Sequence, residues 1–182
     1  MEFETLQTDR LFLKKITPEV LSHLFQNYKD EEIMTVLGLS NYDEFIKERD
    51  KSRGGYTTYD RTILSFLLVL KSTNETIGRC GFHNWYAQHH RAEIGYALAK
   101  EEFKRKGYMR EAVHAVLKYG FEVMHLNRVE AYIGPGNIAS LRIVAKYGFT
   151  QEGVLRQHYA VGGEFQDSII FSLLKNEFAG KE

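Results

Sequence analysis

The chain has 182 residues, of which 43% are hydrophobic and 26% are charged, with 24 basic and 24 acidic side chains. This composition is typical of one globular domain and excludes disordered, collagen-like and coiled-coil chains. The formal net charge of zero disfavours a protein that coats nucleic acid or an anionic membrane through bulk charge. The single cysteine excludes an internal disulfide, the longest apolar run, at residues 66–70, is far shorter than the ~20 residues of a membrane helix, and the acidic N-terminus carries no apolar signal region. We therefore expect one cytoplasmic domain over residues 1–182.

The first half of the chain alternates short apolar runs with turn residues. Residues 11–16 are expected to form a strand, and Thr17 is expected to cap a helix that has Pro18 at its first position. A second helix is expected over residues 42–52. The runs 63–70 and 76–82 flank a polar turn, which is typical of a β-hairpin, and residues 92–99 read as a further strand.

The second half begins with a basic turn at residues 104–107, after which apolar residues recur at the spacing of an amphipathic helix. A strand over residues 128–133, a helix over 137–147 and a hairpin around Gly162 and Gly163 are expected to follow. This order predicts an α/β (α+β) domain with a largely antiparallel sheet and one or two parallel crossovers.

The basic turn predicts an anion site. The first N–H groups of a helix lack internal partners and lie at the positive end of the helix dipole. Gly107 can take a positive φ, which lets several amides converge on one ligand. The alternative is a solvated turn, but basic side chains oppose the dipole of a helix start, so the mismatch favours a bound anion. No nucleoside triphosphatase loop is present, and a third glycine is missing after Gly134 and Gly136.

These residues resemble the Gcn5-related N-acetyltransferases (GNAT), and most closely their ribosomal-protein N-terminal branch. The family loop Gln/Arg-x-x-Gly-x-Gly/Ala reads here as residues 104–109, with Lys in place of Gln/Arg and Met in place of the small residue. Further matches lie at residues 8–13, at Asn137 and Ser140, and at residues 146–149 and 163–170.

The resemblance implies the GNAT fold, with a mixed, mostly antiparallel central sheet, a splayed parallel strand pair and about four helices. It implies acetyl-CoA as cosubstrate, no metal, and a primary amine as acceptor. By resemblance, the turn binds the diphosphate, the strand end pairs with the pantetheine arm, and Asn137 contacts the donor. The donor-binding residues implied are Tyr96, Ala97, Leu98, Lys104, Arg105, Lys106, Gly107, Tyr108, Met109, Arg110 and Asn137.

Acetyl transfer to an amine needs a neutral nucleophile and a proton for the departing thiolate. Glu93 matches a strand glutamate that acts as base in histone-modifying relatives; the alternative is an ordinary exposed strand charge. Relatives place an acid tyrosine seven residues after the asparagine, but Val144 stands there. Ser140 matches the serine of the ribosomal-protein branch, and the resemblance implies that it donates the proton to sulfur; the alternative is a serine that is only tolerated in a first helical turn. Asn137 could equally be a plain helix N-cap.

The acceptor stays open between a protein N-terminal α-amine, as in the ribosomal-protein branch, and a small amine such as a polyamine, amino acid or antibiotic. A low-turnover coenzyme A-binding sensor is the third possibility, and a homodimer is possible. In relatives the last hairpin lines the acceptor side, which suggests Tyr159 and Asp167. Cys80 with His83, and His89 with His90, lack the paired spacing of a zinc site.

Overall fold

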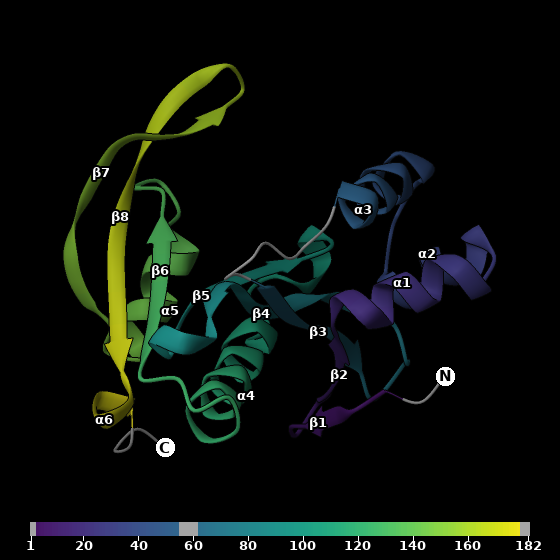
Figure 1. The fold of residues 1–182 in the computed structure, drawn as a ribbon, viewed down its shortest axis with the longest axis horizontal. Coiled ribbons are helices and arrows are strands. Elements are labelled where there is room, and N and C mark those ends of the chain that lie inside the picture. Colours follow the sequence, from purple (N-terminus) through teal and green to yellow (C-terminus); the bar gives the residue numbers. More distant parts are fainter. Residues whose placement is uncertain (1–2, 55–61, 179–182) are drawn as a thin grey trace.

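The computed structural model describes residues 3–54 and 62–178. Within these ranges, eight strands form one sheet in the order β1-β2-β3-β4-β5-β6-β8-β7 (Figure 1). Neighbouring strands are antiparallel except β5 and β6, which run parallel. The strands are β1 (Thr5–Gln7), β2 (Leu11–Ile16), β3 (Thr62–Leu70), β4 (Thr76–Tyr86), β5 (Arg91–Leu98), β6 (Arg128–Ile133), β7 (Thr150–Val161) and β8 (Glu164–Leu174).

Six α-helices lie in the described residues, where the sequence predicts about four. They are α1 (Pro18–Asn27), α2 (Asp30–Leu37), α3 (Tyr42–Gly54), α4 (Tyr108–Glu122), α5 (Ile138–Lys146) and α6 (Lys175–Phe178), with short 3-10 turns at Ala87–His89 and Glu101–Phe103. The two additional helices are α2 and α6. They were not predicted because each is short: α2 buries only Ile33 and Leu37, and α6 buries no residue.

Helices cover both faces of the sheet. On β3, Leu64, Phe66 and Leu68 belong to the core cluster that contains the apolar face of α4, whereas Leu67 and Val69 belong to the cluster under α1, α2 and α3. Alternate residues of a strand point to opposite faces, so α4 and the group α1–α3 lie on opposite sides of the sheet (Figure 1). Helix α5 contributes Val144 to the α4 side.

The parallel strands β5 and β6 part after a short pairing. Their register joins only Arg91–Glu93 to Arg128–Glu130, and the rest of β5 has no partner on that side among the described residues. The expected splayed strand pair is thus present. Because α4 follows β5 and α5 follows β6, two helix N-termini stand at the carboxyl ends of the parting strands, where ligands bind in parallel sheets.

The hairpin of β7 and β8 ends the sheet, and its tip extends away from the rest of the domain (Figure 1). A register shift between Leu155 and Tyr159 bends β7, and Gln157 there has a φ of 53°. None of the helices in residues 3–54 and 62–178 has the length and hydropathy of a membrane span.

Candidate functional site

The basic turn leads into α4 without a side chain that caps the N-terminus of this helix. Gly107 is the N-cap with φ 81° and ψ −1°, a left-handed conformation that favours glycine, and no side chain caps the helix. The first amide bonded within the helix is that of Glu111, which donates to the Gly107 carbonyl at 3.1 Å. The N–H groups of Tyr108, Met109 and Arg110 therefore have no partner inside α4. This is the geometry of an anion site.

The cations around this helix start differ in their partners. Lys104 contacts Glu101, and Lys100 lies 3.0 Å from Glu75. In the part of the chain that the structure describes, no ion pair involves Arg105, Lys106 or Arg110, and all three are exposed. An anion at the helix start would therefore meet cations that are not already neutralised.

Residues near the start of the chain stabilise the basic turn through hydrogen bonds. Glu111 accepts hydrogen bonds from the Thr8 hydroxyl and from the backbone and side chain of Arg10. Burial opposes ionisation of Glu111, yet these bonds lower its pKa below the usual value. Arg10 also donates to the Lys106 carbonyl at 2.9 Å and stacks on Tyr108. The string Thr8-Asp9-Arg10 thus holds the turn in place.

The free stretch of β5 contains Tyr96, Ala97 and Leu98. Tyr96 and Leu98 pack toward α4, and Ala97 is exposed on the opposite face. Met109 is buried in the core, so only its backbone faces the turn. Toward β6 this stretch has no strand partner in the described residues, which leaves its backbone groups available to an extended ligand.

Gly95 lies in a regular part of the sheet. It pairs with Gly81 on β4 with no register shift at that point. A Cβ at Gly95 would lie 2.7 Å and 2.9 Å from ring atoms of His83. Glycine is therefore needed here because the imidazole of His83 lies over it.

Glu93 is buried and held by two side chains. It is 5% exposed, so the alternative of an ordinary exposed strand charge is wrong. Asn84 donates its amide to Oε2 at 2.8 Å, and Nε2 of His83 lies 2.9 Å from Oε1. The His83 side chain is 42% exposed, so it connects the buried carboxylate to the surface. Sequence reasoning missed His83 and Asn84, because their pairing depends on the β4–β5 register.

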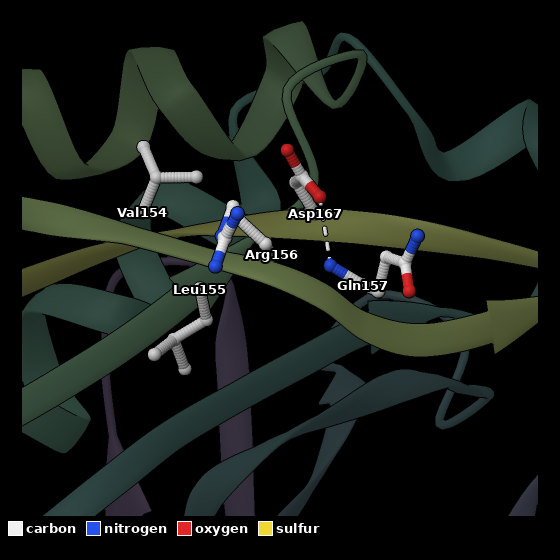
Figure 2. Close-up of a pocket in the computed structure, with 5 residues that line it drawn as sticks. All are labelled: Val154, Leu155, Arg156, Gln157 and Asp167. Atoms are coloured by element: carbon white, nitrogen blue, oxygen red, sulfur yellow. Dashed lines mark hydrogen bonds between the residues drawn. The ribbon is translucent and has the colours of Figure 1, made fainter.

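Two tyrosines from the other side of the parting strands stand near Glu93. Burial, with the negative charges of Glu130 and Glu93, raises the pKa of Tyr132 to about 12. Burial and the charge of Glu93 also raise the pKa of Tyr159, which comes from the last hairpin. Asp167 does not join this group, because its Oδ1 accepts the backbone N–H of Gln157 at 2.7 Å in the bend of β7 (Figure 2).

Ser140 and Asn137 begin α5. Oδ1 of Asn137 accepts the Ser140 N–H at 3.1 Å, so the N-cap role is confirmed, and within the described residues no hydrogen bond involves Nδ2 of Asn137. Burial raises the pKa of Tyr96, and a hydrogen bond with Ser140 partly offsets that rise. The Ser140 hydroxyl therefore has a phenol as its neighbour, and Val144 is buried in the core.

Glu93 and Ser140 lie on opposite sides of the sheet. The side chain of Glu93 lies on the α1–α3 face. Glu93 shares a face with Gly95, which pairs with Gly81, and Gly81 pairs with Ser65, two residues before Leu67 on that face. The side chain of Tyr96, the partner of Ser140, belongs to the α4 face. A proton could therefore leave an amine on one face while a thiolate receives one on the other.

Two cavities lie near these elements. One, of about 320 Å³, lies between the sheet and helices α1 and α3, with His83 and Gly95 in its lining. The other, of about 650 Å³, is an open hollow on the β7–β8 hairpin, lined by Val154, Leu155, Arg156, Gln157 and Asp167 (Figure 2). Only the first contains a residue that contacts Glu93. It is therefore the better candidate for an acceptor.

Cys80, His89 and His90 are not arranged as metal ligands in the structure. Cys80 is fully buried, which raises the pKa of its thiol, and His89 and His90 are exposed. Across residues 3–54 and 62–178, no three His, Cys, Asp or Glu side chains are grouped so that they could hold a metal ion.

Comparisons with known proteins agree with this geometry. Residues 10–150 match the family model described as "Acetyltransferase (GNAT) domain". The chain is 35% identical to the uncharacterized N-acetyltransferase p20 of Bacillus licheniformis, over 97% of this chain and 99% of the relative. It is 29% identical to the [ribosomal protein uS5]-alanine N-acetyltransferase of Escherichia coli, over 54% and 51% of the two chains. A GNAT-family acetyltransferase structure from Bacillus anthracis superposes with a TM-score of 0.66 at 25% identity, covering 94% of this chain and 99% of that one.

Proposed function

The chain belongs to the GNAT acetyltransferase family and is an N-acetyltransferase, and we propose that it acetylates the α-amine of a protein N-terminus. One observation carries the proposal. The parting strands β5 and β6 have a bare, basic helix start at their carboxyl end and a buried, histidine-linked carboxylate at the point where they separate.

The residues at this end of the sheet fit acetyl-CoA, which would supply an activated acetyl thioester. The unpaired amides from Tyr108 to Arg110, with Arg105 and Lys106, would bind the diphosphate, and Lys104 could join them by leaving Glu101. The free edge of β5 at residues 96–98 would pair with the amides of the pantetheine arm. Asn137 keeps its Nδ2 for a further acceptor in this region.

Proton removal from the amine is assigned to Glu93 acting through His83. The carboxylate is too buried to meet an acceptor directly, whereas His83 is half exposed and lies 2.9 Å away. A histidine oriented by a carboxylate is a common general base. At pH 7 an α-amine with a pKa of about 7.7–8.0 is already about 10–17% neutral, so the demand on this pair is modest.

Protonation of the departing thiolate is assigned to Ser140. Its hydroxyl lies at the start of α5, beside the free stretch of β5, and has the phenol of Tyr96 as a neighbour. Tyr96 would supply a second hydroxyl behind Ser140, so that the proton donated to sulfur could be replaced along the pair.

The choice of a protein N-terminus rests on two supports. One is the similarity to the E. coli enzyme named for alanine acetylation of ribosomal protein uS5. The other is chemical: a base reached through His83 suits an amine that is partly neutral at pH 7 better than a lysine, which is about 0.04% neutral.

An acceptor screen tests the proposal. The release of coenzyme A thiol from acetyl-CoA is followed with peptides that begin with Ser or Ala, and in parallel with spermidine. Turnover with the peptides and not with spermidine supports an N-terminal acceptor. Turnover with spermidine alone would redirect the enzyme to small amines. Tight binding of acetyl-CoA without thiol release from either panel would indicate a sensor.

A further inference from the structure

The cavity between the sheet and helices α1 and α3 has a floor of small residues. Ile16, Ser65, Gly81 and Gly95 lie side by side on four neighbouring strands, because each pairs with the next in the sheet register. After Ile16 this row carries only a hydroxymethyl group and two hydrogens. The floor of the cavity is therefore low beneath α1 and α3, and the imidazole of His83 covers its Gly95 end.

Arg79 and His83 stand on either side of Gly81 along β4 and line this cavity together. Both lie on the cavity face, because residues two apart on a strand share a face. Nη1 of Arg79 donates to Oε1 of Glu48 on α3 at 2.6 Å, and Glu48 is 8% exposed. The arginine is thus fixed at the end of the cavity opposite His83.

The other terminal nitrogen of Arg79 has no partner. Nη2 is buried, and no described residue accepts a hydrogen bond from it. A buried guanidinium N–H that stays unpaired is costly, so such groups in native proteins call for a ligand or water. Arg79 lines the cavity and its side chain is 30% exposed, so a turn of the guanidinium toward the cavity would present this N–H to a ligand oxygen there.

The spacing along β4 suggests the length of that ligand. His83 lies four positions after Arg79 on the strand, which is about 13 Å between their Cα atoms at ~3.3 Å per residue. An extended peptide advances by roughly the same distance per residue. Allowing for the reach of both side chains, a peptide with its α-amine at His83 would present the carbonyl of its second or third residue to Arg79.

The charges of the cavity favour such a peptide over a polyamine. The carboxylate of Glu48 is neutralised by Arg79, and Lys51 adds a further cation to the lining. A second ammonium group of a polyamine would meet cations at this end, whereas a carbonyl oxygen would meet a free donor.

We propose that Arg79, held by Glu48, recognises a backbone carbonyl oxygen of the acceptor, so that this enzyme selects amines that belong to peptides. The inference rests on the proposed function and adds a residue that determines specificity. In this arrangement His83 and Glu93 bind the α-amine of the acceptor, and Arg79 binds a backbone carbonyl one or two residues further along the acceptor peptide.

The test compares two acceptors on wild type and on Arg79→Lys. The acceptors are the tripeptide amide Ser-Ala-Ala-NH₂ and an alkylamine of similar length that has no carbonyl. Lysine keeps the positive charge beside Glu48 but lacks the second terminal nitrogen of the guanidinium group, Nη2. For the tripeptide we expect KM to rise about 10- to 100-fold with kcat nearly unchanged, because a charge-assisted hydrogen bond is lost. For the alkylamine we expect a change below threefold.

Arg49→Lys is the matched control. Arg49 lies on α3, and its Nε is buried without a hydrogen bond among the described residues and lies 3.8 Å from Oδ1 of Asp50, but it lines a different cavity. Its replacement should leave both KM values unchanged. If Arg79→Lys does not fold by circular dichroism, the wild-type comparison still decides, since the tripeptide should have at least a tenfold lower KM than the alkylamine when both KM values are expressed as concentrations of neutral amine.

Two results would overturn the inference. Equal KM values for the two acceptors on wild type, or an equal rise for both in Arg79→Lys, would remove Arg79 from acceptor recognition while leaving the acetyltransferase intact. Absence of both acetyl-CoA binding and thiol release with every amine would overturn the proposed function and this inference together.

Discussion

Replacement of Glu93 by Gln tests the proton path most sharply. The substitution keeps the shape of a side chain that is 5% exposed and still offers one oxygen to Asn84. It removes the negative charge beside His83, so the imidazole loses the carboxylate that orients it. We expect the variant to fold and to bind acetyl-CoA normally.

The size of the effect follows from the acceptor. Without the base, only the amine that is already neutral in solution reacts, and for an α-amine at pH 7 this is about 10–17%. The value of kcat/KM should therefore fall roughly six- to tenfold at pH 7. At pH 9 more than about 90% of such an amine is neutral, so the deficit should shrink below about twofold.

The assay is the pH profile of kcat/KM for a peptide beginning with Ser, from pH 6.5 to 9.5. Glu130→Gln is the control, since Glu130 is also buried and pairs with Glu93 in the sheet register, but it binds Arg91 and Arg128. It should lower stability and leave the shape of the profile unchanged. A deficit in Glu93→Gln that is as large at pH 9 as at pH 7 would refute proton removal by Glu93. A loss above a hundredfold at pH 7 would contradict an α-amine acceptor.

Three further outcomes follow from the structure. Ser140→Ala should lower kcat at least tenfold with an unchanged Kd for acetyl-CoA, and unchanged steady-state kinetics would remove Ser140 from the acid role. Gly95→Ala should displace the His83 ring and reproduce the pH-dependent deficit of Glu93→Gln, with a Tm close to wild type because that ring is half exposed. Hydrogen bonds from Arg128 lower the pKa of Glu152 to about 2, so its contribution to stability is present above pH ~4.5 and is lost as the pH falls toward 2. Glu152→Gln should therefore cost about 1 kcal/mol at pH 7, and urea unfolding at pH 2 should show no difference from wild type.

Much of the fold could be predicted because its elements carry local signals. The strand expected over residues 128–133 matches β6, and the helix starts at Thr17 and Asn137 are confirmed by their capping hydrogen bonds. The missed elements lack such signals: β1 has three residues and α6 has four. The bend in β7 depends on the left-handed backbone of Gln157. Glutamine rarely adopts a positive φ, so the sequence did not predict this bend.

The site was predictable where one segment forms it and hidden where several meet. The turn around Gly107 is local, so its geometry follows from glycine and the helix start. The surroundings of Glu93 depend on a register shift in β4 between His83 and Tyr86, which no local pattern marks. The contact of Ser140 with Tyr96 joins β5 to α5, and the pairing of Arg79 with Glu48 joins β4 to α3. These contacts required the three-dimensional structure.

The central claim is that the amides at Gly107 bind the diphosphate of coenzyme A, and calorimetric titration of coenzyme A into the protein tests it most directly. The account predicts one binding site per chain in wild type. In Gly107→Val, whose β-branched side chain opposes a φ of 81°, affinity should be at least tenfold weaker while the far-ultraviolet spectrum stays unchanged. Absence of heat with wild type, or equal affinity in a folded Gly107→Val, would contradict the account.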